Sequence, residues 1–298
     1  MAELAPAIEV EGLTRKFRTT TALENLNLTV PRGCVFGLLG ENGAGKTTLI
    51  KHLMGLYKPQ TGTVRVLGSD PIGDPETTLG QIGYLSEDRD IPRWMRVSEL
   101  MQYTQGFYPK WDETYAQELL ETFELIPSQK IKTLSLGQTA KTGLLVALAH
   151  KPELVVLDEP SSGLDAVVRR HILSSAIRQV ASEGRTVLFS SHLLDEVESV
   201  SDNIAIIDGG EVILCDRLET ILKNHLEIKI ELKESSAGPP KLASAVRIGG
   251  EGRNWTILAN TPTIEQEIAS SGATIIQKKT ATLEEIFLGY VARHTPHS

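Results

Sequence analysis

Two stretches near the start of the chain alternate hydrophobic and polar residues with the period of a β-strand. They are residues 8–17 and 21–30. Residues 154–157 are an unbroken apolar run, which is typical of a strand buried on both faces of a sheet. Further strands are expected at 34–39, 63–67, 82–85, 186–189, 203–208 and 211–215, and helices at 48–54, at 166–182 and from His192. This alternation indicates an α/β protein.

The hydrophobic period becomes helical between about residues 96 and 149. We therefore expect a helical subdomain at about 88–150. Its edges carry Trp94, Met95, Phe107, Tyr108 and Trp111. Such residues are most often part of a core, and the alternative is a groove that receives a partner helix.

The composition changes after residue 226. Residues 226–232 alternate cleanly, and a Pro-, Gly- and Ser-rich break follows at 235–241. Short strands are expected at 255–258 and 273–276, with helices near 263–270 and 282–292. The expected organisation is one domain over residues 1–225 and a small accessory domain over 226–298.

Composition and charge narrow the functional classes. The chain has 298 residues, of which 41% are hydrophobic and 23% charged, a balance that suits a globular protein with a sizeable core. The net charge of −8 argues against a broad nucleic-acid-binding face, because nonspecific affinity for polyanions rests on clustered Lys and Arg. Cys34 and Cys215 form neither a disulfide framework nor a metal-ligand spacing. There is no secretory signal and no apolar run long enough to span a bilayer, so we expect a cytosolic protein that reaches a membrane only through a partner.

Residues 40–47, Gly-Glu-Asn-Gly-Ala-Gly-Lys-Thr, match the phosphate-loop pattern G-x-x-x-x-G-K-[ST]. The glycines let successive N–H groups face one anion, and the start of the following helix adds a partial positive charge. Lys46 is expected on the β- and γ-phosphates, and the Thr47 hydroxyl on Mg²⁺. A chance match is the alternative, but the strand before the loop and the helix after it argue against one. The chain is therefore predicted to bind a nucleoside triphosphate.

Asp158 and Glu159 end the apolar run at 154–157. A carboxylate at the C-terminal end of a parallel strand beside a phosphate loop is well placed to hold Mg²⁺ through water. Glu159, one residue further, is a candidate to polarise the water that attacks the γ-phosphate.

Together with three further motifs, these residues resemble an ATP-binding cassette (ABC) ATPase. The further motifs are Leu134-Ser135-Leu136-Gly137-Gln138, the segment 162–165 and His192, and the whole set spans roughly residues 8–215. The pentapeptide makes the resemblance specific, because ordinary phosphate-loop NTPases lack it. The fold that the resemblance implies is a P-loop NTPase of the ABC ATPase type. It has a RecA-like α/β core, an antiparallel β subdomain and a helical subdomain, here with a small C-terminal α+β region.

The resemblance also implies a role for individual residues. Glu159 is the expected catalytic base, with His192 and Lys46 as catalytic partners at the γ-phosphate. Thr47, Glu87 and Asp158 are the expected metal-associated residues, and Asp165 is expected to communicate across a dimer. The nucleotide-binding residues are expected to be Phe17, Gly40, Asn42, Gly43, Ala44, Gly45, Lys46, Thr47, Thr48, Ser135, Gly137 and Gln138. Phe17 is expected to stack on adenine, and a core aromatic at a strand end is the alternative.

Two positions depart from the family pattern. Leu136 stands where the signature usually has Gly, while Ser135 and Gly137 are kept. Glu87 stands where the family usually presents Gln. An ionised Glu accepts hydrogen bonds but donates none, so we expect Glu87 to sense Mg-ATP with an altered dependence on the metal.

The function implied is ATP hydrolysis in the nucleotide-binding subunit of an ABC exporter. Two such subunits, identical or paralogous, are expected to close head to tail over ATP and drive a separate transmembrane permease. Residues 282–288 resemble the closing helix of subunits that serve ABC-2-type permeases, although any amphipathic helix is the alternative. A soluble cassette ATPase acting on ribosomes or DNA, and a regulatory ATPase on a membrane partner, are the other hypotheses. ATP and Mg²⁺ are the expected cofactors, nucleic acid is not an expected partner, and the permease would hold the chain on the inner face of the cell membrane.

Overall fold

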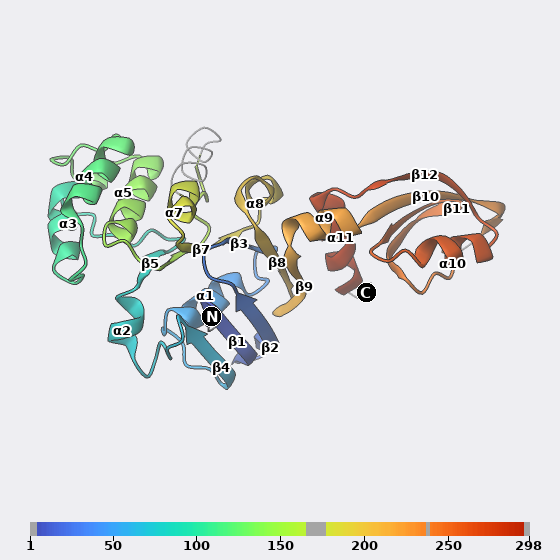
Figure 1. Cartoon of the computed structure of the whole chain (residues 1–298), viewed down its shortest axis with the longest axis horizontal. Coiled ribbons are helices and arrows are strands. Elements are labelled where there is room, and N and C mark those ends of the chain that lie inside the picture. The colour runs from blue at the N-terminus through green and yellow to red at the C-terminus, as the bar shows by residue number, and fades with distance from the viewer. Residues whose placement is uncertain (1–4, 165–176, 237–238, 295–298) are drawn as a thin grey trace. The chain divides into compact units, whose positions relative to one another are not determined.

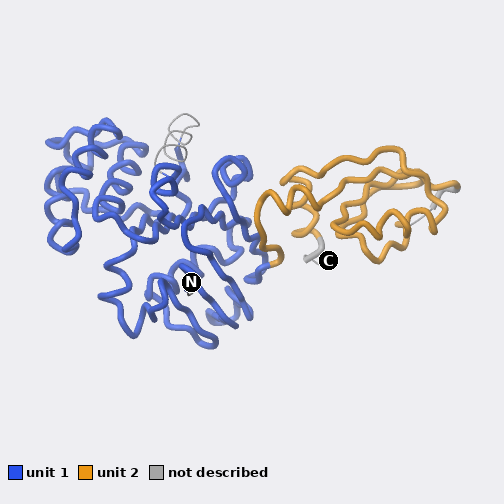
Figure 2. The backbone as a smooth tube through the Cα atoms, in the orientation of Figure 1, with its two compact units in different colours: residues 1–212 blue, residues 213–298 orange. Residues whose placement is uncertain are grey.

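The chain forms two compact units, residues 1–212 and residues 213–298 (Figure 2). The computed structural model describes residues 5–164, 177–236 and 239–294. The boundary between the two compact units lies after residue 212. The domain limit predicted after residue 225 stays a prediction, because a division by compactness does not define domains.

An antiparallel sheet opens the first unit (Figure 1). Its strands are β1 (Ile8–Phe17), β2 (Thr20–Val30) and β4 (Thr61–Val66), and β1 lies in the middle. Ile8 pairs with Val30 on one side and with Val66 on the other. The alternation seen in the sequence thus turns one face of the sheet towards a core.

A second, mixed sheet carries the strands that position the functional site. Its order is β5-β6-β7-β3-β8-β9. The bounds are β3 (Val35–Leu39), β5 (Ile82–Leu85), β6 (Leu154–Leu157), β7 (Thr186–Ser191), β8 (Asn203–Asp208) and β9 (Glu211–Arg217). The pairs β5–β6, β6–β7, β7–β3 and β3–β8 are parallel, so the C-terminal ends of these strands meet at one edge. Every residue of β3, β6 and β7 is buried, as the unbroken apolar runs predict.

One core joins the two sheets of the first unit. It contains side chains of β1, β2 and β4, of the second sheet, and of α1 (Lys46–Leu53), with Phe36, Leu38 and Leu49 among the fully buried ones. The mixed α/β architecture expected for the ABC ATPase type is confirmed.

The described helices of the first unit match the prediction in part: the helix over residues 75–79 was not expected, and residues 166–176 of the expected helix 166–182 lie outside the described residues. The described helices are α1, α2 (Pro75–Leu79), α3 (Val97–Gln105), α4 (Glu113–Thr122), α5 (Leu136–Leu148), α7 (Arg178–Ser182) and α8 (Leu194–Val200), with a 3₁₀ turn at Ile131–Thr133. Helices α3, α4 and α5 lie together at one end of the unit (Figure 1). A Cβ at Gly83 of β5 would lie 2.1 Å from the Ala147 carbonyl oxygen, so glycine there lets α5 rest directly on the sheet.

Side chains at the edges of the helical insert divide between core and surface. Met95 is buried, as the core interpretation predicts. Trp94 and Phe107 are 72% and 64% exposed, so that interpretation is wrong for these two residues. Tyr108 stacks on the buried His150 with ring centroids 3.9 Å apart.

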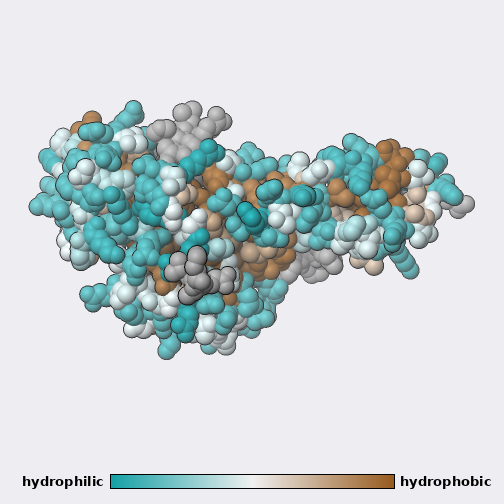
Figure 3. Space-filling view, in the orientation of Figure 1, coloured by the Kyte–Doolittle hydropathy of each residue, from teal (hydrophilic) through white to brown (hydrophobic). Residues whose placement is uncertain are grey.

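The second unit is built on a three-stranded antiparallel sheet of order β11-β10-β12. Its elements are α9 (Leu218–Asn224), β10 (Leu226–Ser236), β11 (Ala245–Ala259), α10 (Ile264–Ser270), β12 (Thr274–Thr280) and α11 (Leu283–His294). Ile228, Ile230, Trp255 and Ile257 form its core with α10. Figure 3 shows hydrophobic side chains over β12, where Ile275 and Ile276 are exposed.

Among the described residues, no helix has the length and apolar character needed to cross a membrane.

Candidate active site

The loop at residues 40–45 leads from β3 into α1 and curls as the motif predicts. Gly43 and Gly45 have φ of 87° and 113°, a conformation that favours glycine. At Gly45 a Cβ would also lie 2.7 Å from the Ala22 carbonyl oxygen. The loop is tied to its surroundings by the Gly210 N–H, which donates to the Ala44 carbonyl at 3.0 Å.

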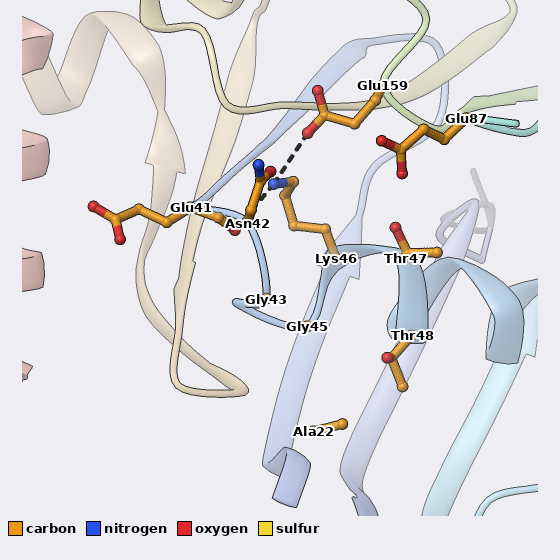
Figure 4. Close-up of a pocket in the computed structure, with 10 residues that line it drawn as sticks. All are labelled: Ala22, Glu41, Asn42, Gly43, Gly45, Lys46, Thr47, Thr48, Glu87 and Glu159. Carbon is orange, nitrogen blue, oxygen red and sulfur yellow. Dashed lines mark hydrogen bonds and ion pairs between the residues drawn. The ribbon is translucent and has the colours of Figure 1, made fainter. Parts of the chain in front are cut away.

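A cavity of about 230 Å³ opens beside this loop (Figure 4). Its lining combines loop residues with side chains from the ends of β5 and β6, namely Ala22, Glu41, Asn42, Gly43, Gly45, Lys46, Thr47, Thr48, Glu87 and Glu159. The predicted nucleotide-binding residues of the loop and the acidic residues after two neighbouring strands are thereby brought together.

Lys46 and Glu159 form a buried ion pair across the cavity (Figure 4). Lys46 Nζ lies 3.1 Å from Glu159 Oε1, and both side chains are at least nine-tenths buried. The ammonium also donates to the carbonyl oxygens of Gly40 at 2.6 Å and Glu41 at 3.3 Å. Leaving such a cation without these acceptors would be costly, so the loop conformation and the carboxylate support each other.

Glu159 is held from three sides. Its second carboxylate oxygen lies 2.8 Å from His192 Nδ1, and its backbone N–H donates to Ser190 Oγ at 2.8 Å. Its φ of 45° is left-handed, which is uncommon for a residue with a side chain and is sustained by these contacts. Of the predicted catalytic residues, Glu159 is thus in contact with both Lys46 and His192.

Asp158 is buried beside the start of α1. Its Oδ1 accepts from Ser190 Oγ at 2.7 Å and from Thr47 Oγ1 at 3.3 Å. Burial is the main cause that raises the pKa of Asp158; the hydrogen bonds from Ser190 and Thr47 oppose it, and the nearby Glu159 adds to it.

Glu87 follows β5 and faces the Thr47 hydroxyl across the cavity (Figure 4). Burial raises the pKa of Glu87, and the negative charges of Asp158 and Glu159 raise it further. Three carboxyl groups, of Glu87, Asp158 and Glu159, therefore interact electrostatically at one edge of the sheet. Such a group of acids favours a cation or a proton among them.

These oxygens suit Mg²⁺ in a particular way. The described part of the chain holds no cluster of three or more His, Cys, Asp or Glu with the geometry to hold a metal ion. Mg²⁺ normally keeps several waters and binds through one or two carboxylates together with substrate phosphates. The Thr47 hydroxyl and the Asp158 carboxylate, which are in contact, fit that mode of binding.

Signature residues lie away from this cavity, at the start of α5. Ser135 caps the helix, because its Oγ accepts from the Gln138 N–H at 3.2 Å while Gln138 Oε1 accepts from the Ser135 N–H at 3.0 Å. Within the described part of the chain the Ser135 hydroxyl donates to no acceptor, so its proton is available to a ligand. Among the described residues that line the cavity, Ser135, Gly137 and Gln138 do not occur.

Phe17 is at the end of β1 and does not belong to the described cavity lining. Its ring is 37% exposed and meets Tyr57 edge to face at 5.6 Å. The Arg15 guanidinium lies 4.6 Å from the centroid of the Phe17 ring. The partial exposure leaves ring surface for a base. Asp165, predicted to act across a dimer, lies outside the described residues.

Ser190 was missed by reasoning from the sequence. It donates to Asp158 and accepts from the Glu159 N–H, so it fixes both acids. A signal was present, since Ser190 ends the apolar run 186–189 as Asp158 ends the run 154–157. Parallel strands bring such positions to the same edge.

Comparisons with known proteins give matches in sequence and in fold. Residues 23–162 match the ABC transporter family model. The daunorubicin/doxorubicin resistance ATP-binding protein DrrA of Streptomyces peucetius is 34% identical over 80% of this chain and 75% of its own length. The bacitracin transport ATP-binding protein BcrA of Enterococcus faecalis is 33% identical over 69% of this chain and 68% of its own. The solved structure of an ATP-binding subunit of an ABC transporter matches with a TM-score of 0.67 and 28% identity, over 73% of this chain and 92% of that one.

The burial of Asp158 generates a prediction about stability. We expect Asp158→Asn to increase the free energy of unfolding at neutral pH by about 1 kcal/mol, because a desolvated charge is replaced by a neutral amide. The raised pKa means that the folded protein holds this proton more tightly than the unfolded chain does. The free energy of unfolding of the wild type should therefore rise as the pH falls through the folded-state pKa of Asp158. The difference in this free energy between the wild type and Asp158→Asn should become smaller. Chemical denaturation with EDTA present, over a pH series, measures this.

Asp90→Asn is the matched control, because Asp90 is an exposed carboxylate on the loop after β5. A variant Asp158→Asn that is less stable than the wild type at neutral pH, or a gap that widens towards acid pH, would contradict the prediction.

Proposed function

The chain belongs to the family of ABC transporter ATP-binding proteins, and on that premise we propose that it powers an exporter whose permease is a separate polypeptide. It binds ATP and hydrolyses it. The observation that carries the mechanism is the contact of Glu159, at the phosphate-loop cavity, with both Lys46 and His192. The remaining steps are assigned to named residues below.

Glu159 acts as the general base for the attacking water. A carboxylate at hydrogen-bond distance from a histidine is oriented by it, and His192 sits 2.8 Å away with part of its ring exposed. Lys46 neutralises charge on the β- and γ-phosphates. Water attacks phosphorus as the bond to the β-phosphate oxygen breaks, and Glu159 accepts the proton of the water.

Thr47, Asp158 and Glu87 hold Mg²⁺ in this proposal. When bound, the ion neutralises charge that develops on the phosphate oxygens. The Thr47 hydroxyl and the Asp158 carboxylate, which are in contact, would hold the ion, Thr47 as a ligand and Asp158 through water. Glu87 senses the metal with a full negative charge where an amide is usual for the family.

The signature of a second subunit completes the site. Ser135 and Gly137 open α5 but do not line their own chain's described cavity, while the Ser135 hydroxyl proton is free to donate. A second copy, or a paralogous subunit, that approaches head to tail would bring this helix start, with its partial positive charge, to the γ-phosphate. Asp165 would transmit closure between the two subunits, and Phe17 would stack on adenine.

An export role is favoured by the names of two relatives, one a drug-resistance and one a bacitracin-transport protein. The permease is proposed to be of the ABC-2 type, and it holds the chain at the inner face of the cell membrane. The final helix α11 starts with a reciprocal cap between Thr282 and Glu285, and residues 282–288 resemble the closing helix of subunits of that class. Action on ribosomes or DNA is not favoured, given the acidic charge balance.

Exposed aromatic residues mark the surface proposed to receive the permease. Trp94, Tyr103 and Phe107 are 72%, 53% and 64% exposed, and the last two rings meet edge to face at 5.1 Å. Exposed aromatic side chains of this kind are the usual anchors of protein interfaces. We call these three residues the aromatic surface.

Glu159→Gln and Lys46→Ala separate hydrolysis from binding. We expect Glu159→Gln to keep ATP binding, lower turnover by at least about a thousandfold, and accumulate a dimer with ATP, because the base is lost while the phosphate contacts remain. Lys46→Ala should weaken ATP binding itself, by about tenfold or more. Steady-state ATPase rates, equilibrium ATP binding and size-exclusion chromatography with light scattering measure these effects.

A near-normal ATPase rate in Glu159→Gln would remove Glu159 from catalysis. A strictly monomeric Glu159→Gln chain saturated with ATP would refute the proposed dimer.

The charge of Glu87 predicts an altered response to Mg²⁺. We expect Glu87→Gln to raise the Mg²⁺ concentration that gives half-maximal ATPase activity by a few-fold, because one carboxylate near the metal is lost. Titration with Mg²⁺ at constant ATP measures this. If Glu87→Gln changes neither the Mg²⁺ dependence nor the ATPase rate, the proposed role of Glu87 at the metal is refuted.

If the aromatic surface binds the permease, substitutions in it should weaken the association of the permease with the chain. We expect the tagged chain, purified gently from native membranes, to carry a protein with multiple membrane spans that mass spectrometry identifies. The double variant Trp94→Ser with Phe107→Ser should lose most of that partner while its ATP binding is kept. Leu56→Ser, at another exposed apolar residue of the first unit, is the control and should retain it. Retention by the double variant contradicts the assigned surface, and recovery of ribosomal proteins or DNA contradicts the exporter role.

A further inference from the structure

Arg89 connects two loops that the proposed mechanism treats separately. It lies in the loop after β5, two residues beyond Glu87. Its Nη2 donates to the carbonyl oxygen of Pro160 at 3.4 Å and, over a shorter distance, to that of Ser162. Both acceptors belong to residues 160–163, the turn that directly follows Glu159.

The turn after Glu159 is closed by hydrogen bonds within its own backbone. The Ser162 N–H donates to the Glu159 carbonyl at 3.0 Å, which closes the turn on the catalytic glutamate itself. Glu159 is left-handed at the entrance to this turn, a conformation that needs support from its surroundings. The guanidinium supplies support from outside, because its Nη2 donates charge-assisted hydrogen bonds to two carbonyl oxygens of the turn.

Arg89 is itself held in place. It is left-handed, with φ of 49°, and lies in a tight turn in which its N–H donates to the Ser86 carbonyl at 3.1 Å and its carbonyl accepts from the Ile91 N–H at 2.8 Å. Its side chain is half-buried. The Glu87 carboxylate lies near enough to interact electrostatically with the guanidinium. The backbone turn and the partial burial therefore hold the Arg89 side chain at this position.

The start of the signature helix approaches the same turn. A Cβ at Gly163 would lie 3.9 Å from Leu136 Cδ1, so Leu136 at the unusual position of the signature lies beside residues 160–163. The turn is therefore placed between Arg89 and the first residue of α5. Both neighbours belong to the segment that carries the helical subdomain and, in the proposed function, the aromatic surface.

From these contacts we infer that Arg89 is a positioning residue for Glu159. It fixes the turn 160–163 against the loop that carries Glu87, so a displacement of that loop by the helical subdomain displaces the catalytic carboxylate. The inference rests on the proposed function, because it assumes that Glu159 is the general base. It adds a residue that touches neither phosphate nor metal but sets the geometry of the base.

The test compares Arg89→Ala and Arg89→Lys with Arg93→Ala in the full chain. Arg93 is an exposed arginine four residues along the same segment and serves as the control. We expect Arg89→Ala to lower kcat roughly ten- to a hundredfold with a change in KM for ATP of no more than about threefold, since misplacement of a catalytic group affects the chemical step. Arg89→Lys should recover part of the loss, because an ammonium keeps a charged hydrogen-bond donor but does not place it where Nη2 of Arg89 lies. Arg93→Ala should match the wild type.

A second measurement separates positioning from folding. ATP bound per chain at saturation, and ATP affinity, are measured for Glu159→Gln with and without Arg89→Ala. Unchanged stoichiometry, with affinity within about twofold, supports the inference, because a merely structural role would reduce the fraction of chains that bind. A loss of kcat that only follows a loss of binding stoichiometry would overturn it. Should Arg89→Ala fail to fold, Arg89→Gln and Arg89→Lys carry the comparison of kcat.

Failure of the inference can be told from failure of the proposed function. Normal turnover in Arg89→Ala, while Glu159→Gln is inactive, refutes the role of Arg89 and leaves the base in place. Normal turnover in Glu159→Gln refutes the base and, with it, the inference.

Discussion

A buried ammonium must be surrounded by acceptors, and much of the first unit is arranged to provide them for Lys46. The loop at 40–45 supplies two carbonyl oxygens, and Glu159 supplies the opposite charge at 3.1 Å. Glu159 reaches this place because β6 is separated from β3 by β7 alone in the sheet. The order of the strands, the left-handed backbone of Glu159 and the curl of the glycine loop therefore serve one electrostatic requirement.

The parts of this arrangement that depend on local sequence could be predicted. Lys46 and Thr47 follow from a loop motif between a strand and a helix, and Asp158 and Glu159 follow from an apolar run that ends in acids. Parallel strands bring such ends together, so the meeting of Lys46 with Glu159 needed only the correct fold class. The helical insert was likewise visible from its period, because α3 and α4 bury one face each.

Contacts between loops could not be predicted in the same way. Arg89 and Ser190 have no motif of their own, and their roles come from which strands are neighbours and from backbone turns with unusual φ. Trp94 and Phe107 were expected in a core because aromatic side chains are usually buried, yet both are exposed. The helical period of the segment does not show which of its aromatic side chains face solvent. The length of β11 was also underestimated, since Gly249, Gly250 and Gly252 interrupt the alternation inside a continuous strand.

In the ion pair of Lys46 with Glu159, the carboxylate occupies the position at the ammonium that a phosphate would take. In the proposed function, an incoming γ-phosphate would not meet a bare cation. It would replace a carboxylate that already faces the ammonium. Since one anion replaces another, the free energy of this contact is a difference between two ion pairs, and it is smaller than either alone. The same carboxylate, once released, is freed beside the phosphate it has made way for. In the proposed function, binding of the phosphate and release of the base would thus be two outcomes of a single exchange.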